Sequence, residues 1–144
     1  MKSIKLRYLK TIVLSAICTC TLNSIAYAEN TAALQGIKLG FGHDMGLGIA
    51  LQKDKINGFV GNHGLAVDYK MVAEKLEASI PAQWYIGAGG FAQWDGDLGG
   101  RLPIGIEASF AKGFDAYAQI IPELKLVNDL GFGLGAGLAV RYQF

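Results

Sequence analysis

Cysteine, proline and long apolar runs are all scarce in this chain of 144 residues. Its two cysteines, Cys18 and Cys20, lie near the amino terminus, and it has three prolines. No basic stripe typical of nucleic-acid binding is present. Beyond residue 28 no apolar stretch approaches the ~20 residues of a membrane helix. These absences argue against a disulfide scaffold, a nucleic-acid-binding protein and a bundle of transmembrane helices.

The first 28 residues have the pattern of a secretory signal peptide. Four basic residues within positions 2–10 precede an apolar run at 12–18, and the small-residue motif Ala26-Tyr27-Ala28 follows. We predict export through the Sec pathway of a Gram-negative envelope and cleavage between Ala28 and Glu29. Residues 1–28 are then the signal peptide, and residues 29–144 form a single domain.

Both cysteines lie within the predicted signal peptide. Lipidation of Cys18 or Cys20 is the alternative, but Ile17 and Thr19 do not suit the position before a lipidated cysteine. Cleavage after Ala28 leaves no cysteine, and therefore no disulfide or thiolate zinc site. It also leaves 9 Lys+Arg against 12 Asp+Glu, because four of the 13 basic residues are removed.

Glycine and alternating apolar residues dominate what remains. In residues 130–144 every even position is apolar or aromatic, and the odd positions hold glycine, alanine, Arg141 and Gln143. Strict period-two alternation indicates a strand with two different faces. Similar alternation predicts eight strands, at residues 36–42, 45–52, 56–62, 65–73, 82–94, 101–110, 114–127 and 130–144.

The chain length fits an all-β, eight-stranded, antiparallel up-and-down transmembrane barrel. Membrane strands take about 9–11 residues each, so eight strands with short turns need roughly 110 residues. We expect local bulges at Pro103 and Pro122, because proline cannot donate a ladder hydrogen bond. Residues 74–81 are the longest predicted connection and could hold a helical turn. The facing of strand 82–94 stays open.

The polarity of the two faces favours a membrane over a soluble barrel. The polar face combines charges with glycines, as the crowded interior of an eight-stranded barrel requires. The apolar face is flanked by aromatic residues, a trait of membrane barrels: Phe41, Tyr69, Trp84, Trp94, Phe110, Phe132, Tyr142 and Phe144. A lipocalin-like, soluble periplasmic barrel that binds a small ligand is the alternative.

Nine charged residues are predicted to face the lumen, where buried charges must pair or stay hydrated. They are Lys38, Asp68, Lys70, Arg101, Glu107, Asp115, Glu123, Lys125 and Arg141. We interpret them as a structural ion-pair network that plugs the barrel, with a small polar site or an ion path as the alternative. An open pore is not expected, because aqueous channels are built from about 16–18 strands.

The second half of the chain resembles small outer-membrane β-barrel proteins of unknown function, of the OmpA-like kind. The matching pieces are residues 85–90 (YIGAGG), 100–107 (GRLPIGIE), 122–126 (PELKL) and 135–144 (GAGLAVRYQF). The resemblance implies an eight-stranded barrel in the outer membrane and no activity. The ending also resembles the signal read by the barrel assembly machinery, which assigns that role to Leu138, Val140, Tyr142 and Phe144. Outer-membrane lipid and this machinery are the expected partners of a monomer.

A lipid-A-modifying barrel enzyme is the less favoured alternative. Such an enzyme needs a nucleophile and a base within hydrogen-bond reach. The mature serines, Ser79 and Ser109, are predicted at one end of the barrel, whereas His43 and His63 occupy turns at the other. The sequence therefore predicts no catalytic, cofactor-binding or metal-binding residues.

Overall fold

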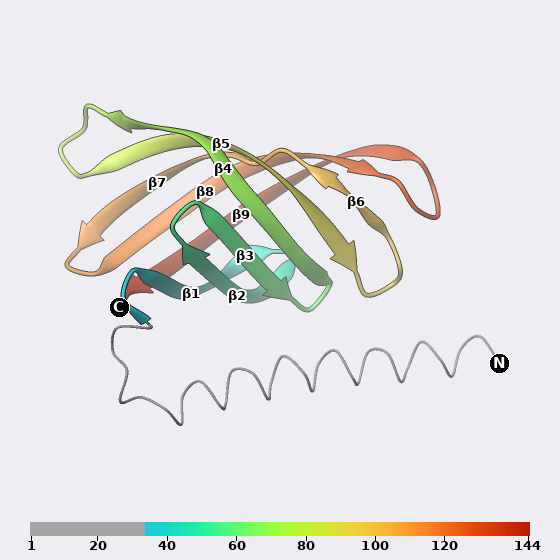
Figure 1. Cartoon of the computed structure of the whole chain (residues 1–144), viewed down its shortest axis with the longest axis horizontal. Coiled ribbons are helices and arrows are strands. Elements are labelled where there is room, and N and C mark those ends of the chain that lie inside the picture. Colours follow the sequence, from blue (N-terminus) through green and yellow to red (C-terminus); the bar gives the residue numbers. More distant parts are fainter. Residues whose placement is uncertain (1–33) are drawn as a thin grey trace, which may run out of the picture. The chain divides into compact units, whose positions relative to one another are not determined.

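The computed structural model describes residues 34–144, so the predicted signal peptide and its cleavage site lie outside the described residues. Within this described part of the chain nine strands follow one another (Figure 1). They are β1 (Ile37–Asp44), β2 (Gly46–Lys53), β3 (Ile56–Gly61), β4 (Gly64–Leu76), β5 (Ala82–Gln93), β6 (Leu98–Arg101), β7 (Ile104–Ala111), β8 (Phe114–Lys125) and β9 (Gly131–Gln143). No helix among residues 34–144 is long and apolar enough to cross a bilayer.

The strands close into an eight-stranded antiparallel barrel, as the sequence predicts. Consecutive strands pair along the chain, with β6 and β7 together taking the place of one strand, and β1 pairs with β9 to complete the ring. β6 and β7 are two halves of one strand, because both pair with β5 on one side and with β8 on the other. The register shifts by ten residues around the ring. The series of paired residues that starts at Gly40 and crosses β2 to β8 reaches β9 at Gly131, whereas Gly40 itself pairs with Arg141 of β9. Such a stagger requires tilted strands.

The two prolines interrupt single hydrogen bonds but not the register, so the predicted bulges at Pro103 and Pro122 are wrong. The carbonyl of each proline still accepts a hydrogen bond from a neighbouring strand. The Leu102 N–H donates to Pro122 O over 2.9 Å, and the Gly87 N–H donates to Pro103 O over 2.8 Å. The register shifts instead between Lys70 and Val72 and between Ser109 and Ala111. A strand therefore accommodates proline without a bulge where the carbonyl keeps its partner.

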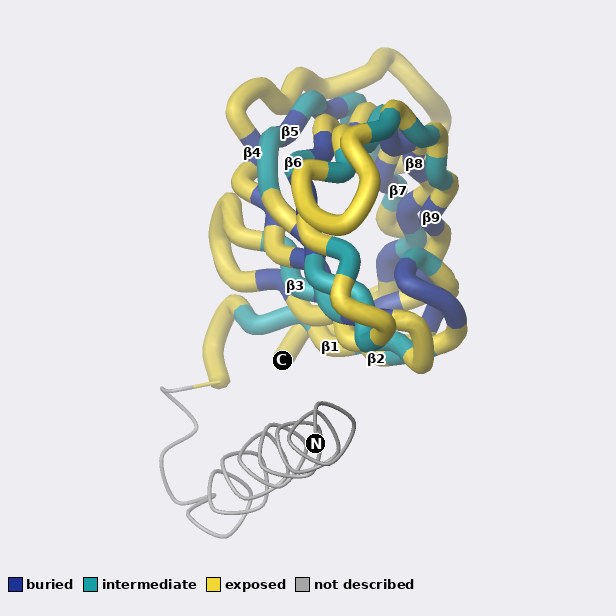
Figure 2. Tube along the Cα trace, turned by 90° about the vertical axis from the view of Figure 1, so that its right-hand side faces the viewer, coloured by how far each residue is buried: buried dark blue, intermediate teal, exposed yellow. Residues whose placement is uncertain are grey.

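The two faces of the strands differ as the alternation predicts. In Figure 2 buried and exposed residues alternate along the strands. On β9, Gly137, Ala139 and Arg141 are buried, whereas Phe132 and Leu134 are 78% and 71% exposed. The facing of β5 is also resolved, because Tyr85 and Phe91 point inward and are almost fully buried.

We call the end of the barrel where β1 begins and β9 ends the proximal end, and the opposite end the distal end. The proximal end holds the turns at residues 54–55 and 112–113 and the longer connection at 77–81. That connection contains bends and no helical turn. The distal end holds Met45 and the connections at 62–63, 94–97 and 126–130.

Candidate functional site: the charged lumen

The barrel interior holds eight buried polar or charged side chains. They are Gln52, Asp68, Lys70, Arg101, Glu107, Asp115, Gln119 and Arg141. With the half-buried Lys38 and Asp44, the charged members form two groups that lie at different heights in the lumen. The proximal cluster is Lys38, Lys70, Glu107, Asp115 and Arg141, and the distal cluster is Asp44, Asp68 and Arg101.

Glu107, on β7, is the most connected residue of the proximal cluster. It accepts hydrogen bonds from Lys70 Nζ and Gln83 Nε2, and from Arg141 Nη2 over 2.9 Å. Lys38 Nζ lies 3.9 Å from Glu107 Oε1. Side chains from four other strands thus meet at the Glu107 carboxylate. Its charge compensates the burial of Lys70 and Arg141.

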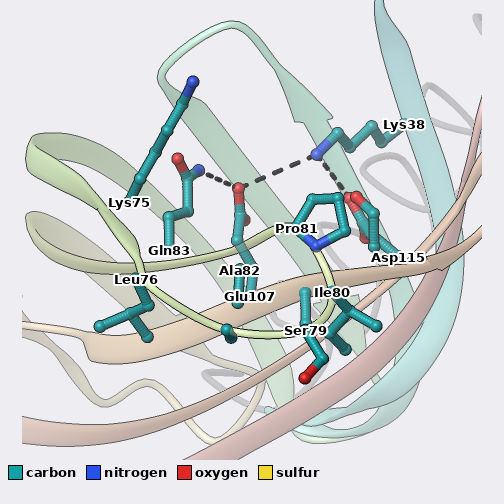
Figure 3. A pocket seen from close by; sticks show the side chains of 13 residues that line it. Lys38, Lys75, Leu76, Ser79, Ile80, Pro81, Ala82, Gln83, Glu107 and Asp115 are labelled. Atoms are coloured by element: carbon teal, nitrogen blue, oxygen red, sulfur yellow. Dashed lines mark hydrogen bonds and ion pairs between the residues drawn. The ribbon is translucent and has the colours of Figure 1, made fainter.

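Asp115, on β8, is the second carboxylate of this cluster. It accepts from Arg141 Nε over 2.7 Å and pairs with Lys38 Nζ at 2.5 Å. Figure 3 shows Lys38 between Glu107 and Asp115 at the edge of a cavity of about 500 Å³. The cavity lies at the proximal mouth, under the 77–81 connection. The charges that face it are already paired, apart from Lys75, which points away from them.

The distal cluster is centred on a single guanidinium, that of Arg101. Its two terminal nitrogens donate to the two oxygens of Asp44, over 2.9 and 2.6 Å. This fork is the strongest geometry for an arginine–carboxylate pair. Arg101 Nε lies 3.1 Å from Asp68 Oδ1, within ion-pair distance but without hydrogen-bond alignment.

Uncharged side chains connect the two clusters. The Tyr85 hydroxyl donates to Gln119 Oε1 over 2.7 Å, and Gln119 Nε2 donates to Asp44 Oδ2 over 3.0 Å. Lys70 Nζ lies 4.5 Å from the centre of the Tyr85 ring, and Arg141 stacks on the ring of Tyr117. Polar contacts therefore run continuously from the proximal to the distal cluster.

An apolar group shares the lumen with the charges, and sequence reasoning missed it. Its buried members are Met45, Ala50, Phe59, Ala66, Phe91, Tyr117 and Ala139. Met45 turns inward from the one-residue connection between β1 and β2, and its sulfur lies 3.7 Å from Arg101 Nη1. The lumen is filled by both charged and apolar side chains, as expected of a barrel of this size.

Inward-facing glycines leave the space that these side chains occupy. A Cβ on Gly40 would lie 2.7 Å from Arg141 Cγ and 2.0 Å from Val140 O. A Cβ on Gly137 would lie 3.0 Å from Gln119 Nε2 and 3.3 Å from Asp44 Oδ2. Glycine is therefore required at Gly40, where a Cβ would collide with the β9 backbone, whereas a Cβ at Gly137 would press on the Gln119 and Asp44 side chains that link the clusters.

The structure brings seven of the nine predicted lumen residues into the two clusters. Glu123 is half-buried and has no ion pair among residues 34–144. Lys125 lies at the distal rim, where it pairs with Asp97 at 2.5 Å. Hydrogen bonds from Lys125 and Asn128 hold the pKa of Asp97 below its usual value.

Asp44 is the charged lumen residue that the sequence analysis missed, because it assigned His43 and Asp44 to a turn. β1 runs through Asp44, and its inward positions are Lys38, Gly40, Gly42 and Asp44. Extending the alternation of this strand by two residues would have placed the carboxylate in the lumen.

The residues considered for catalysis lie at opposite ends of the barrel. Ser79 and Ser109 line the proximal cavity, whereas His43 and His63 are exposed at the distal end. Within residues 34–144, no three His, Cys, Asp or Glu side chains are grouped as metal ligands. No family model, curated protein or solved structure matches the chain.

Proposed function

We propose that this chain is a small, non-catalytic outer-membrane β-barrel protein with a structural or interaction role and a plugged lumen. The observation that carries the proposal is the inverted polarity of the barrel. Large apolar side chains such as Phe41, Leu134 and Ile120 are more than half exposed on the outside, while Arg101 and Arg141 are 2% exposed within. In water this arrangement would leave an extensive apolar surface uncovered, whereas a bilayer covers it.

The filled lumen supports a closed barrel over a channel. Two ion-pair clusters, the tyrosine–glutamine link and the apolar side chains occupy its length. A lipocalin-like carrier would need an apolar interior and a polar exterior, whereas here the exterior is apolar and charged groups share the interior with apolar side chains. The separation of the serines from the histidines likewise favours a non-catalytic role.

The outer face of β9 supports the proposed recognition by the assembly machinery. Leu138, Val140, Tyr142 and Phe144 all point outward and are 41–60% exposed. Tyr142 and Phe144 pack edge to face, and Phe114 and Phe110 extend this aromatic group along the proximal rim. Deletion of Phe144 should reduce assembly into the outer membrane, and unchanged assembly would contradict the assigned signal.

Fractionation of a Gram-negative host tests the main proposal. The protein should pellet with the outer membrane, require detergent for extraction and migrate faster on gels when it is not heated. Recovery as a soluble periplasmic protein would overturn the proposal.

A pair of arginine substitutions makes the test specific to the outer wall. Ile120 lies mid-strand on β8 and is 55% exposed, whereas Val127 lies in the distal connection. Ile120→Arg should cost about 2–4 kcal/mol near the bilayer midplane and deplete the heat-modifiable form. Val127→Arg should leave that form unchanged. Equal tolerance of both variants would favour a soluble barrel.

A further inference from the structure

The barrel wall is much lower on one side than on the other. β3 has 6 residues and β2 has 8, whereas β4 and β9 have 13 each (Figure 1). At about 3.3 Å per residue and a tilt near 45°, six residues rise roughly 14 Å along the axis and thirteen rise roughly 30 Å. The hydrocarbon core of a bilayer is about 30 Å thick. The β9 wall matches that thickness, and the wall formed by β2 and β3, which we call the short wall, does not.

The apolar belt shortens together with the strands. On β3 the outward positions are Ile56, Gly58 and Val60, and the belt ends proximally at the exposed Lys53 and Lys55. On β9 the apolar outward positions continue from Phe132 to Tyr142, with apolar residues beyond both ends of the strand. A lipid chain beside the short wall therefore meets fewer apolar side chains than one beside β9.

An unpaired edge of β4 gives a second, independent limit on where the hydrocarbon core ends beside the short wall. The Lys70 N–H donates to Lys55 O over 2.8 Å, and β3 pairs with no later residue of β4. From Val72 to Leu76, β4 pairs only with β5, and its other edge borders a cavity of about 370 Å³ lined in part by Lys55 and Glu74. Lipid-exposed strand edges do not occur in the hydrocarbon region. The hydrocarbon boundary must therefore lie no further proximally than the 54–55 turn.

We propose that the short wall holds a locally thinned bilayer, with phospholipid headgroups drawn in to Lys53 and Lys55. This inference rests on the proposed membrane location. Lipid is the occupant because the apolar outer surface continues without a break onto Phe41 of β1 and Val67 of β4. Lysines at the edge of the belt reach phosphate groups while their stems stay in the apolar zone. A short apolar stretch is accommodated by thinning of the bilayer around it.

Spin labels on the outer wall test the thinning directly. In a Cys18→Ser/Cys20→Ser background, the protein carries one label at Leu47 or Ile56, the two ends of the short wall, or at Phe132 or Tyr142 on β9. Accessibility to oxygen and to a nickel complex gives each label's depth in dilauroyl and in dioleoyl phosphatidylcholine vesicles. The short-wall labels should stay at headgroup level in both lipids. Burial of either label in the thicker dioleoyl bilayer would overturn the inference.

A matched pair of lysine variants tests the same idea through folding. Lys55→Leu extends the short wall proximally, whereas Lys112→Leu makes the same change at the turn between β7 and β8. Lys55→Leu should raise the folded fraction in dioleoyl vesicles severalfold over wild type, and Lys112→Leu should not. Equal behaviour of the two variants would overturn the inference.

Two further outcomes separate this inference from the proposed function. Dipolar broadening between Ile56 labels would show a second copy on the short wall in place of lipid and would overturn the inference. A wild-type protein that inserts into no vesicle would overturn the membrane location itself.

Discussion

The two lumen clusters differ in how many cations hold them together. In the proximal cluster three cations surround two carboxylates, and both Glu107 and Asp115 have more than one cationic partner. In the distal cluster Arg101 is the only cation among residues 34–144 that pairs with Asp44 and Asp68. The difference teaches that buried charge can be held by redundant pairs or by one shared partner, and that these arrangements respond differently to the loss of one member.

The largest effect is expected from Arg101→Met, because this change leaves the carboxylates of Asp44 and Asp68, whose side chains are 3% and 7% exposed, without a cation. Removal of one partner from a buried pair costs about 3–5 kcal/mol. Urea unfolding in lipid vesicles, followed by the heat-modifiable band, measures the loss. The variant Arg101→Met/Asp44→Asn/Asp68→Asn should recover most of the stability. A single variant as stable as wild type would refute the dependence on one guanidinium.

A smaller loss is expected from Glu107→Gln in the proximal cluster. After this substitution Lys38 and Arg141 still pair with Asp115, so Lys70 is the one cation of the proximal cluster left without a carboxylate partner. The substituted amide still offers Lys70 an oxygen that can accept a hydrogen bond, so the expected loss is about 1–3 kcal/mol. The same unfolding assay compares the two variants, and a loss larger than that of Arg101→Met would reverse the proposed contrast between the clusters.

Tyr85→Phe should have a still smaller effect, about 1 kcal/mol, because it removes one hydrogen bond to Gln119. A double-mutant cycle with Arg101→Met shows whether this link couples the clusters. A coupling energy near zero would mean that the clusters stabilise the barrel independently.

The smallest effect is expected at the exposed rim, from Lys125→Met. Because the pKa of Asp97 is lowered by Lys125, their contact stabilises the fold above the unfolded pKa of Asp97. This stabilisation is lost as the pH falls through the lowered, folded pKa. Lys125→Met should match wild type in strong acid and differ from it only slightly at neutral pH, as pH-dependent unfolding measures. A neutral-pH loss as large as that of Glu107→Gln would place Lys125 within the lumen network.

Alternation made the barrel and the facing of most charges predictable, because a strand's side chains have only two directions. The same rule failed at Asp44, where a polar pair was read as a turn although a single residue, Met45, connects the strands. It also failed at Lys125. This residue occupies an inward-facing position of the alternating pattern, but it is the last residue of β8, and its side chain pairs with Asp97 at the distal rim. The bulges predicted at Pro103 and Pro122 are absent because the ladder tolerates both prolines, and the register shifts instead at positions that no proline marks.

The pairing of β1 with β9 has a consequence for how the barrel folds. This ladder places Lys38 opposite Gln143, at the two ends of the described strands. With β6 and β7 counted as one strand, every other ladder joins neighbours in the chain, so the contact between β1 and β9 bridges the greatest sequence separation. Contacts between distant residues form slowly, because the intervening chain must be ordered first. The hairpins between neighbouring strands are therefore expected to form fast, and the pairing of β1 with β9 should limit the rate of folding.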